Sequence, residues 1–331
     1  MQHRRLGQTG PVTSALGLGL MGMSDFYGAA DETESLATIH AALDAGVTLL
    51  DTGDFYGVGH NESLLGRALA RSSRREQAIV SLKFGALRDP AGGFIGYDNR
   101  PKSVKNFLAH SLQRLGLDHV DIYRPSRLDP EVPIEDTIGA IVELQQAGYV
   151  RHIGLSEVGL ETIRRAAATA PISDLQIEYS LFSRGIEDAI LPAVRELGIG
   201  VTAYGVLSRG LLTGDWRRPK PGEFDFRAIS PRFQEGNVER NLQLATALGS
   251  VAESRGITRA QAAIAWVAAQ GEDIVPVVGA RRRDRLEEAL DSLDVSLSVD
   301  DLAAIERAVL RGAAAGGRYP DQQLAFMDSE R

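Results

Sequence analysis

Three ionisable side chains have the types and the spacing that proton transfer to a carbonyl group requires. Asp51 follows the apolar run Val47–Leu50, and Tyr56 lies a short way further along the chain. Lys83 follows the next apolar run, Ala78–Leu82. A phenol with the ordinary pKa of about 10 is a weak acid at neutral pH, and an adjacent ammonium makes it more acidic. Because Asp51 would keep Lys83 charged and oriented, Tyr56 is predicted to act as a general acid.

Polar side chains also end the other apolar runs. They are Ser126 with Arg127, Ser156 with Glu157, Gln176 with Glu178 and Tyr179, and Tyr204. The last run leads into Gly279 and a basic cluster. Active sites of barrel enzymes lie at the carboxyl ends of the strands. These side chains are therefore predicted to converge on one rim.

The elements that would position these residues alternate along the chain. Eight short, mainly apolar runs are typical of parallel strands buried on both faces: Ala15–Leu20, Val47–Leu50, Ala78–Leu82, Val120–Tyr123, Val150–Leu155, Leu175–Ile177, Gly200–Ala203 and Ile274–Val278. Amphipathic helical segments lie between them, among them Glu34–Asp44, Glu62–Ala70, Ser103–Leu115, Glu135–Ala147, Gly159–Thr169 and Ile186–Leu197. The alternation predicts βαβ units of an α/β fold that close into a (β/α)8 TIM barrel, with a doubly wound open sheet as the alternative.

Other segments are expected outside the barrel strands. Turn residues in the first eleven positions favour an N-terminal β-hairpin. The stretch Ser208–Gly236, expected without regular secondary structure, is predicted to lie over the carboxyl-end mouth, and Tyr319 and Phe326 are expected to pack near it. No linker divides the chain, so residues 1–331 are predicted to form one domain.

Composition restricts the function classes. The 331 residues carry a net charge of −8, which argues against nucleic acid as a partner. The absence of cysteine excludes disulfides, thiolate metal sites and a cysteine nucleophile. No histidine cluster ends the strands, so no metal is predicted and a metal-dependent hydrolase is disfavoured. No run approaches the ~18 apolar residues of a membrane span, and the start has no signal-peptide pattern. We therefore expect a cytoplasmic protein without a membrane partner.

Several motifs together resemble the aldo-keto reductase family. Asp51–Gly57, read with Asn61 and Glu62, is similar to the family motif D-T-A-x-x-Y-G…N-E. Similar stretches cover nearly the whole chain: Arg4–Gly10, Leu18–Ser24, Tyr149–Glu157, Gln176–Leu181, Leu207–Gly214, Gln261–Trp266 and Val275–Arg282. They look like those of bacterial and plant reductases related to the potassium-channel β subunits. The resemblance implies an enzyme that reduces small-molecule carbonyl compounds to alcohols.

The resemblance also implies an NADP(H) cofactor held without a Rossmann glycine motif. The catalytic positions that it implies are Asp51, Tyr56, Lys83 and Ser126. Ser156, Glu157 and Gln176 would hold the nicotinamide carboxamide, and Tyr179 would stack on the ring. Further cofactor contacts are implied at Gly22, Met23, Asp51, Tyr204, Val206, Leu207, Ser208, Arg209, Gly210, Val278, Gly279, Ala280, Arg281, Arg285 and Glu288.

The chain departs from the family pattern at three positions. Ser126 stands where the family has a catalytic histidine, and a hydroxyl does not titrate near neutral pH. Either Ser126 positions the carbonyl, directly or through a water, or Tyr56 works almost alone. Glu157 stands where many relatives have Asn, and Ala289 replaces an Asn on the adenine side.

A dense basic run follows the last strand and would select the cofactor. It comprises Arg281, Arg282, Arg283 and Arg285. By resemblance, this region binds the adenosine 2′-phosphate, and the planar fork of arginine suits a phosphate. The run therefore favours NADPH over NADH.

Two alternatives remain open at the level of sequence. The chain could instead be an NADP(H)-binding regulatory or sensor module, because the family's histidine is replaced. The substrate is an aryl aldehyde if aromatic side chains line the mouth, or a pyridoxal-type aldehyde as in some related reductases. The aromatic candidates are Phe26, Tyr27, Trp216, Phe224, Phe226 and Phe233. The sequence also allows a homo-oligomer.

Overall fold

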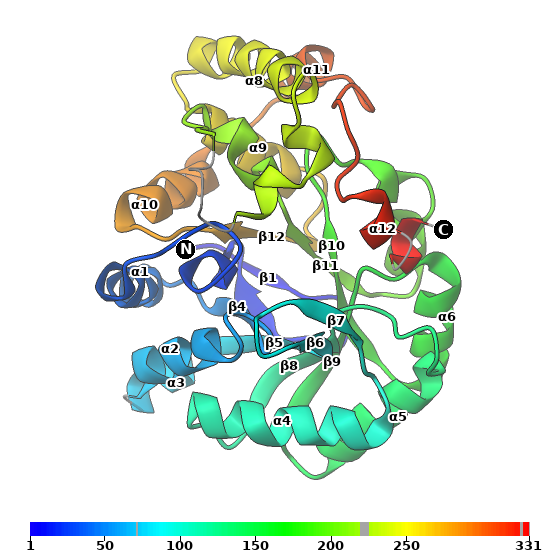
Figure 1. The fold of residues 1–331 in the computed structure, drawn as a ribbon. Helices are drawn as coiled ribbons and strands as arrows, with labels where there is room; N and C mark the ends of the chain where they lie inside the picture. Colours follow the sequence, from blue (N-terminus) through cyan, green and yellow to red (C-terminus); the bar gives the residue numbers. More distant parts are fainter. Residues whose placement is uncertain (71, 219–224, 325–326, 331) are drawn as a thin grey trace.

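The fold is a closed barrel of eight parallel strands, seen in a computed structural model that describes residues 1–70, 72–218, 225–324 and 327–330 (Figure 1). The barrel strands in chain order are β3 (Gly17–Gly19), β4 (Leu49–Gly53), β5 (Ile79–Phe84), β8 (Val120–Pro125), β9 (Val150–Ser156), β10 (Ile172–Glu178), β11 (Gly200–Tyr204) and β12 (Ile274–Gly279). Each pairs with the next, and β12 closes the ring by pairing with β3 at Val277↔Gly17. The barrel is confirmed, and this closure rules out the open sheet.

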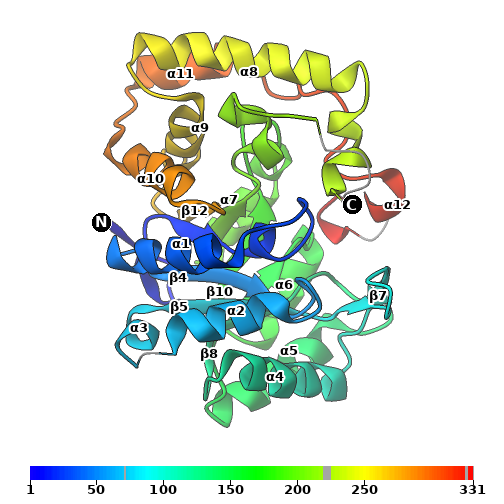
Figure 2. The ribbon, with the colours of Figure 1, turned by 60° about the vertical axis from the view of Figure 1, so that its left-hand side comes forward.

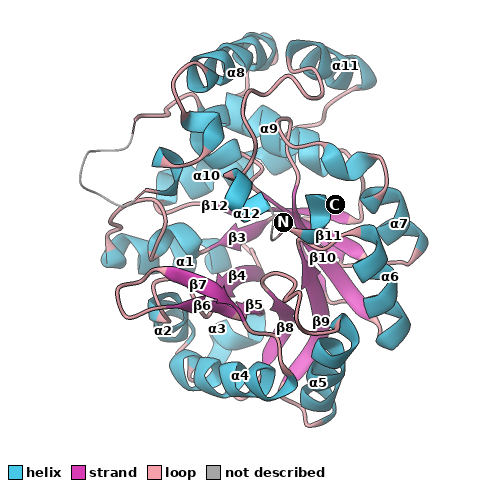
Figure 3. Ribbon diagram, turned by 45° about the vertical axis from the view of Figure 1, so that its right-hand side comes forward, coloured by secondary structure: helices cyan, strands magenta, loops and turns pink. Residues whose placement is uncertain are grey.

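Helices surround the barrel because each crossover must cover the outer face of two strands (Figure 3). They are α1 (Glu32–Asp44), α2 (His60–Leu69), α3 (Ser72–Gln77), α4 (Pro101–Leu115), α5 (Ile134–Gln146), α6 (Leu160–Thr169), α7 (Ile190–Glu196), α9 (Arg259–Ala268) and α10 (Arg283–Asp291). Local signals fix their ends. The Asp31 carboxylate caps α1 by accepting from the Glu34 N–H at 2.8 Å. Helix α4 begins at Pro101, and Gly116, whose φ is 64°, stops it after Leu115.

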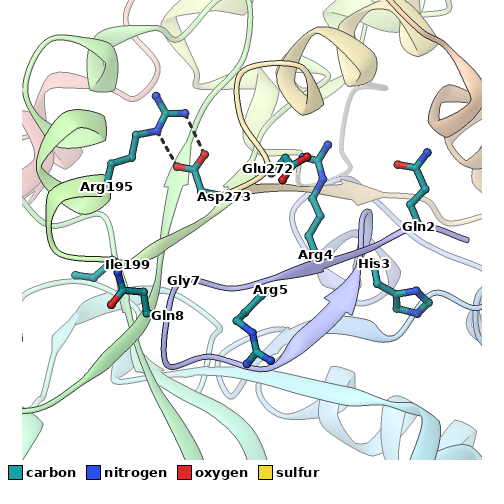
Figure 4. A pocket seen from close by; sticks show the side chains of 11 residues that line it. Gln2, His3, Arg4, Arg5, Gly7, Gln8, Arg195, Ile199, Glu272 and Asp273 are labelled. Carbon is teal, nitrogen blue, oxygen red and sulfur yellow. Dashed lines mark hydrogen bonds and ion pairs between the residues drawn. The ribbon is translucent and has the colours of Figure 1, made fainter.

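The predicted N-terminal hairpin is confirmed and lies at the amino ends of the strands. Its strands are β1 (His3–Arg5) and β2 (Val12–Ser14). The Gln8 N–H donates to the Gly198 carbonyl, just before β11, at 2.7 Å, and Arg4 donates to the carbonyl of Gly271, before β12, at 3.0 Å. A cavity of about 480 Å³ lies between the hairpin and these strand starts (Figure 4). It is therefore at the opposite end from the polar strand termini.

Three segments lie outside the barrel at or near its carboxyl end. One is a second hairpin of β6 (Ala86–Arg88) and β7 (Phe94–Tyr97). Another is the stretch 208–236, which contains three short 3-10 helices within its described part, η3 (Ser208–Thr213), η4 (Phe226–Ala228) and η5 (Pro231–Phe233). The sequence missed these helices because single turns have no periodic apolar pattern.

The third segment is the C-terminal tail, which begins after helix α11. The long helix α8 (Asn237–Ser254) and α11 (Val299–Ala308) pack together away from the barrel (Figure 2). From α11 the chain returns to the mouth and forms α12 (Asp321–Leu324) and η7 (Asp328–Glu330). Phe326 and Phe224, both expected near the mouth, lie outside the described residues. In the described part of the chain, no helix is both long enough and apolar enough to cross a membrane.

Candidate active site

The three predicted catalytic residues meet at the carboxyl end of β4 and β5. The Lys83 Nζ donates to Asp51 Oδ2 at 2.5 Å, and both side chains are more than nine-tenths buried. Lys83 Nζ also lies 5.2 Å from the centroid of the Tyr56 ring. Gly57, with a φ of 56°, turns the chain immediately after Tyr56. Neighbouring strands thus bring an ion pair beside a phenol.

A buried polar network fixes the Asp51 carboxylate. Its Oδ1 accepts from Ser81 Oγ at 3.0 Å and from Gln176 Nε2 at 2.8 Å. Ser81 and Lys83 point to the same side of β5 because they are two residues apart. Ser81 Oγ in turn accepts from Arg124 Nη2 at 3.0 Å. Asp51 therefore has little freedom to rotate.

Burial dominates the acidity of the predicted catalytic groups. It raises the pKa of Tyr56 well above 10, because the phenolate loses hydration, and the charge of Asp51 raises it further. Burial also lowers the pKa of Lys83, against the opposing charge of Asp51. The sequence-based expectation that Lys83 makes Tyr56 more acidic thus understated burial. A phenol of raised pKa can still protonate an alkoxide, because an alkoxide is a stronger base than a phenolate.

Ser126, at the family's histidine position, directly follows β8. Its backbone N–H donates to the Phe84 carbonyl at 2.8 Å, which holds it beside the end of β5. The residue is 1% exposed, and its Oγ has no hydrogen-bond partner among the described residues. A buried hydroxyl without a partner is costly unless a ligand or water satisfies it.

Of the residues predicted to hold the nicotinamide, some lie at the mouth and one turns away from it. Ser156 ends β9 and pairs in register with Gln176, which lies two residues before the end of β10. Ser156 Oγ is buried without a described partner. The side chain of Tyr179 turns toward the outer helices, where its hydroxyl donates to Glu187 at 2.8 Å and its ring centroid lies 5.6 Å from that of Trp266. Stacking of Tyr179 on the cofactor stays a prediction that these contacts do not favour.

Glu157 is engaged by the C-terminal tail. Arg318 donates to its two oxygens at 2.9 and 2.8 Å, and Ser329 Oγ donates at 2.6 Å. Tyr204 Oη also donates to it at 2.7 Å, and the N–H of Glu178 at 2.9 Å. Although burial opposes ionisation, the charge of Arg318 holds the pKa of Glu157 below its usual range. The carboxylate that replaces an Asn thus anchors the tail across the mouth.

The turn after β11 brings an arginine into the mouth. Ser208 and Arg209 have φ of 47° and 54°, a backbone conformation that residues other than glycine rarely adopt. Arg209 donates to the Arg318 carbonyl at 2.8 Å and lies 3.4 Å from Glu178 Oε2. Strained backbone of this kind is common at ligand sites. The neighbouring predicted contacts lie on the same turn: Val206, Leu207 and Gly210.

The end of β12 and the segment after β3 form a second edge of the mouth. Arg281 donates to the carbonyls of Tyr27 at 3.0 Å and Ala29 at 3.3 Å. A side chain at Gly22 would contact Arg281 and Tyr27, so this glycine permits the approach. The other predicted residues here are Met23, Val278 and Ala280, which are buried, and Gly279, which is exposed.

The basic run is largely paired within the protein. Arg282 pairs with Asp284 and Arg283 with Glu34. Arg285 pairs with Asp215 and, at 2.9 Å, with Glu288. Arg285 and Glu288 also line a cavity of about 310 Å³ together with Gly214, Thr258 and Arg259. Arg281 is the member of the run without a carboxylate within 4.0 Å in the described part of the chain.

Comparison with known proteins agrees with this geometry. The sequence pattern of the Aldo/keto reductase family matches residues 15–309. The chain belongs to the aldo/keto reductase family. The aldo-keto reductase yakc of Schizosaccharomyces pombe, whose name carries NADP(+), is 40% identical over 332 residues, covering 98% of this chain and 97% of that protein.

Solved reductases share the fold. A glycerol dehydrogenase from Gluconobacter oxydans superimposes with a TM-score of 0.83 at 31% identity, over 92% of this chain and 94% of the other. The holo form of an aldo-keto reductase from Bacillus halodurans gives 0.77 at 26% identity, over 93% and 96% of the two chains. The barrel with its strand-end polar residues is thus the family fold.

Two groups of this aldo/keto reductase's mouth were not predicted from sequence. Arg318 offered no signal, because it follows a stretch rich in Gly and Ala and finds its partner 161 residues away. Arg127 was placed at a strand end but given no role; its Nη1 donates to the Ser126 carbonyl at 2.6 Å and its Nη2 to Tyr319 Oη at 3.3 Å. In the described residues no cluster of His, Asp and Glu could hold a metal ion.

The aromatic candidates for the mouth differ in their surroundings. The rings of Phe226 and Tyr319 lie 5.7 Å apart, and those of Trp216 and Phe233 lie 5.9 Å apart. Phe26 lies 6.1 Å from the Tyr56 ring, centroid to centroid. Phe26 therefore lies beside Tyr56, whereas Phe233 belongs to the hydrophobic core and Trp216 packs against that core.

Proposed function

We propose that this reductase converts aldehydes or ketones to alcohols with NADPH, and that Tyr56 protonates the carbonyl oxygen. The observation that carries the proposal is the buried Asp51–Lys83 pair beside Tyr56, with Nζ 5.2 Å from the ring centroid. A buried ion pair costs desolvation free energy on folding, and a protein that only binds a ligand does not need this one. Placed beside an acid at a strand end, it supports proton transfer.

The chain's own residues divide the work of the reaction. Tyr56 holds the proton, because burial and the charge of Asp51 disfavour its loss to water. Lys83 stabilises the phenolate that forms when the proton has moved, and Asp51 holds Lys83 in place at 2.5 Å. Ser126 offers a free hydroxyl near the carbonyl. The nicotinamide, when bound, supplies the hydride.

The residues at the mouth fit an NADPH molecule. Ser156 Oγ is buried without a described partner and suits a carboxamide. Arg281 has no carboxylate partner among the described residues and suits the added phosphate of NADPH. The cavity of about 310 Å³ beside Arg285 and Glu288 lies along the same edge. Since Arg285 already pairs with two carboxylates, Arg281 is the better candidate for cofactor selection.

Replacement of Tyr56 by Phe tests the proposal. The variant keeps the ring that packs on Phe55 at 4.6 Å and loses the donated proton. We expect turnover of an aryl aldehyde to fall by roughly 10²–10⁴-fold, the usual worth of a general acid. The dissociation constant for NADPH should stay near the wild-type value. It is measured from the quenching of protein fluorescence, with NADH titrated for comparison.

Two outcomes would contradict the proposal. A Tyr56→Phe variant with most of the wild-type turnover would mean that another group supplies the proton. A wild-type protein that binds NADPH tightly but reduces no aldehyde or ketone in a broad screen would favour the regulatory module instead.

A further inference from the structure

The inner mouth of the barrel has an excess of positive charge. Three largely buried arginines, with side chains 6–12% exposed, face two carboxylates that are almost fully buried. The arginines are Arg209, Arg232 and Arg318, and the carboxylates are Glu157 and Glu178. A third carboxylate, the more exposed Glu330, pairs with Arg318 at 2.5 Å. Arg127 adds a fourth cation to this group. The excess stands out in a chain whose net charge is −8.

Arg127 differs from the other three in its partners. Each of the others lies within 4.0 Å of Glu157 or Glu178, whereas Arg127 reaches no carboxylate at that distance among the described residues. Within the described structure its guanidinium donates to two neutral oxygens, the Ser126 carbonyl at 2.6 Å and Tyr319 Oη at 3.3 Å. Its carbon Cζ lies 5.8 Å from the Tyr319 ring. Although burial opposes its charge, tyrosines and the more distant Glu157 carboxylate raise the pKa of Arg127, so it stays a cation. With no carboxylate bonded to it among the described residues, its guanidinium can still take an anion.

The position of Arg127 points to the substrate as that anion. It follows Ser126 directly, and its charge acts on both Tyr56 and Lys83. It therefore lies on the side of the mouth where the carbonyl must be protonated. Arg281, the other mouth arginine discussed above without a carboxylate, lies instead on the edge formed by β12 and Tyr27. The cofactor phosphate would account for Arg281 but leaves Arg127 unexplained.

We propose that Arg127 binds a carboxylate of the substrate, so that the reductase prefers aldehydes or ketones that carry a carboxylate a short distance from the carbonyl group. The planar guanidinium has five N–H donors, and the described contacts leave several of them available for a carboxylate. Ser126 Oγ and Tyr56 would then receive the carbonyl oxygen. This inference rests on the proposed carbonyl reduction and names its substrate class.

Two aldehydes that differ only in charge test the inference. The rates kcat/KM for 4-carboxybenzaldehyde and for its methyl ester are measured with saturating NADPH. Because a charge-assisted hydrogen bond is worth roughly a tenfold to a hundredfold change in binding, we expect the wild type to prefer the acid by at least about tenfold. Arg127→Gln should abolish this preference, and Arg127→Lys, which keeps the charge but not the fork, should retain part of it.

Arg88→Gln is the matched control. Arg88 is also a largely buried arginine close to Phe26, at 5.4 Å from its ring, but it is paired with Asp25. Its replacement should leave the ratio of the two rates at the wild-type value. Circular dichroism and the melting temperature of each variant show whether it is folded.

The outcomes separate this inference from the proposed function. A wild type without preference for the acid, or a preference that survives Arg127→Gln, would overturn the inference and leave carbonyl reduction intact. An equal loss of both rates would also overturn it, since Arg127 would then polarise every carbonyl. If the wild type reduces neither aldehyde, carbonyl reduction fails; calorimetry of benzoate against benzamide, with and without Arg127→Gln, then decides whether Arg127 binds a carboxylate.

Discussion

Single polar atoms without partners mark where this protein is prepared for a ligand. Ser126 Oγ and Ser156 Oγ are both buried, and neither has a described hydrogen-bond partner. They end β8 and β9, which are adjacent in the barrel. Elsewhere in the interior, hydroxyls such as Ser81 and Thr202 are bonded. Ser126 and Ser156 thus leave two hydroxyls available to a ligand at the strand ends, whereas Ser230, a third buried hydroxyl without a described partner, lies between η4 and η5.

Ser126→Ala separates a role in catalysis from a role in stability. Removal of an unpaired buried hydroxyl should leave the melting temperature unchanged or higher. If the hydroxyl contacts the carbonyl, the single-turnover rate of hydride transfer should fall about tenfold, the worth of one hydrogen bond. Ser230→Ala is the control, because Ser230 Oγ is also buried without a described partner. An equal rate in Ser126→Ala and wild type would make Ser126 a spectator.

Asp54, beside Tyr56 in the sequence, gives the protein a dependence on pH. Burial, assisted by the charge of Glu62, raises its pKa from an ordinary 3.8 to about 8. The folded state then binds a proton that the unfolded state releases, so stability should fall as the pH rises from about 4 to about 8. Asp54→Asn cannot lose a proton. The free energy of unfolding of the variant, relative to that of the wild type, should therefore rise by a few kcal/mol between these two pH values.

Urea unfolding of both proteins at pH 5 and pH 9 checks this prediction. The variant's advantage should be larger at pH 9, and a difference that does not change with pH would contradict it. The side-chain amide introduced by Asp54→Asn can keep an acceptor for the Gly85 N–H, which Asp54 Oδ2 now contacts at 3.3 Å. Gross loss of the fold is therefore not expected.

At the level of elements, the barrel could be predicted because its strands are buried on both faces. Each of the eight apolar runs contains or overlaps one barrel strand, and Asp51 and Lys83 meet because β4 and β5 pair in register at Asp51↔Ser81. The closure of the mouth could not be predicted. Short 3-10 turns and the C-terminal tail have no periodicity, and their partners are far away in the sequence.

Arg318→Gln tests whether the Glu157 contact holds the tail in place. Removal of one partner from a buried pair leaves the other charge uncompensated, which costs several kcal/mol locally. Hydrogen exchange of peptides from the tail, residues 318–330, should therefore accelerate while the barrel strands stay protected. Arg311→Gln is the control, because Arg311 pairs with Asp188 at a side chain 42% exposed. Unchanged exchange in Arg318→Gln would mean that packing alone holds the tail.

At the scale of the whole molecule, one ion pair connects the barrel interior to the active site. Arg124 on β8 and Asp174 on β10 are both 0% exposed and pair at 2.8 Å over the intervening strand β9. Thr202 Oγ1 also donates to Asp174 at 2.7 Å. Gly154 leaves room for the guanidinium, since a Cβ there would lie 3.0 Å from Arg124 Cζ. Arg124 continues through Ser81 to Asp51. This pair could not be predicted from the sequence, because both residues lie within mainly apolar strands.

Asp174→Asn should show how much the fold depends on this pair. The change keeps the size of the side chain and leaves the Arg124 charge buried without compensation, so the free energy of unfolding should fall by about 3–5 kcal/mol. Asp273→Asn is the matched control: its partner Arg195 is 42% exposed at the side chain, and the loss should stay below about 1 kcal/mol. Urea unfolding measures the stability of both variants.

The same substitution should affect the rate of hydride transfer in the folded enzyme, because Arg124 also donates to Ser81, whose hydroxyl holds Asp51. Asp174→Asn should therefore lower this rate, whereas Asp273→Asn should not. Equal losses of stability in the two variants would mean that the barrel interior is hydrated enough to tolerate a lone arginine, and an unchanged rate would mean that Lys83 and Gln176 suffice to hold Asp51.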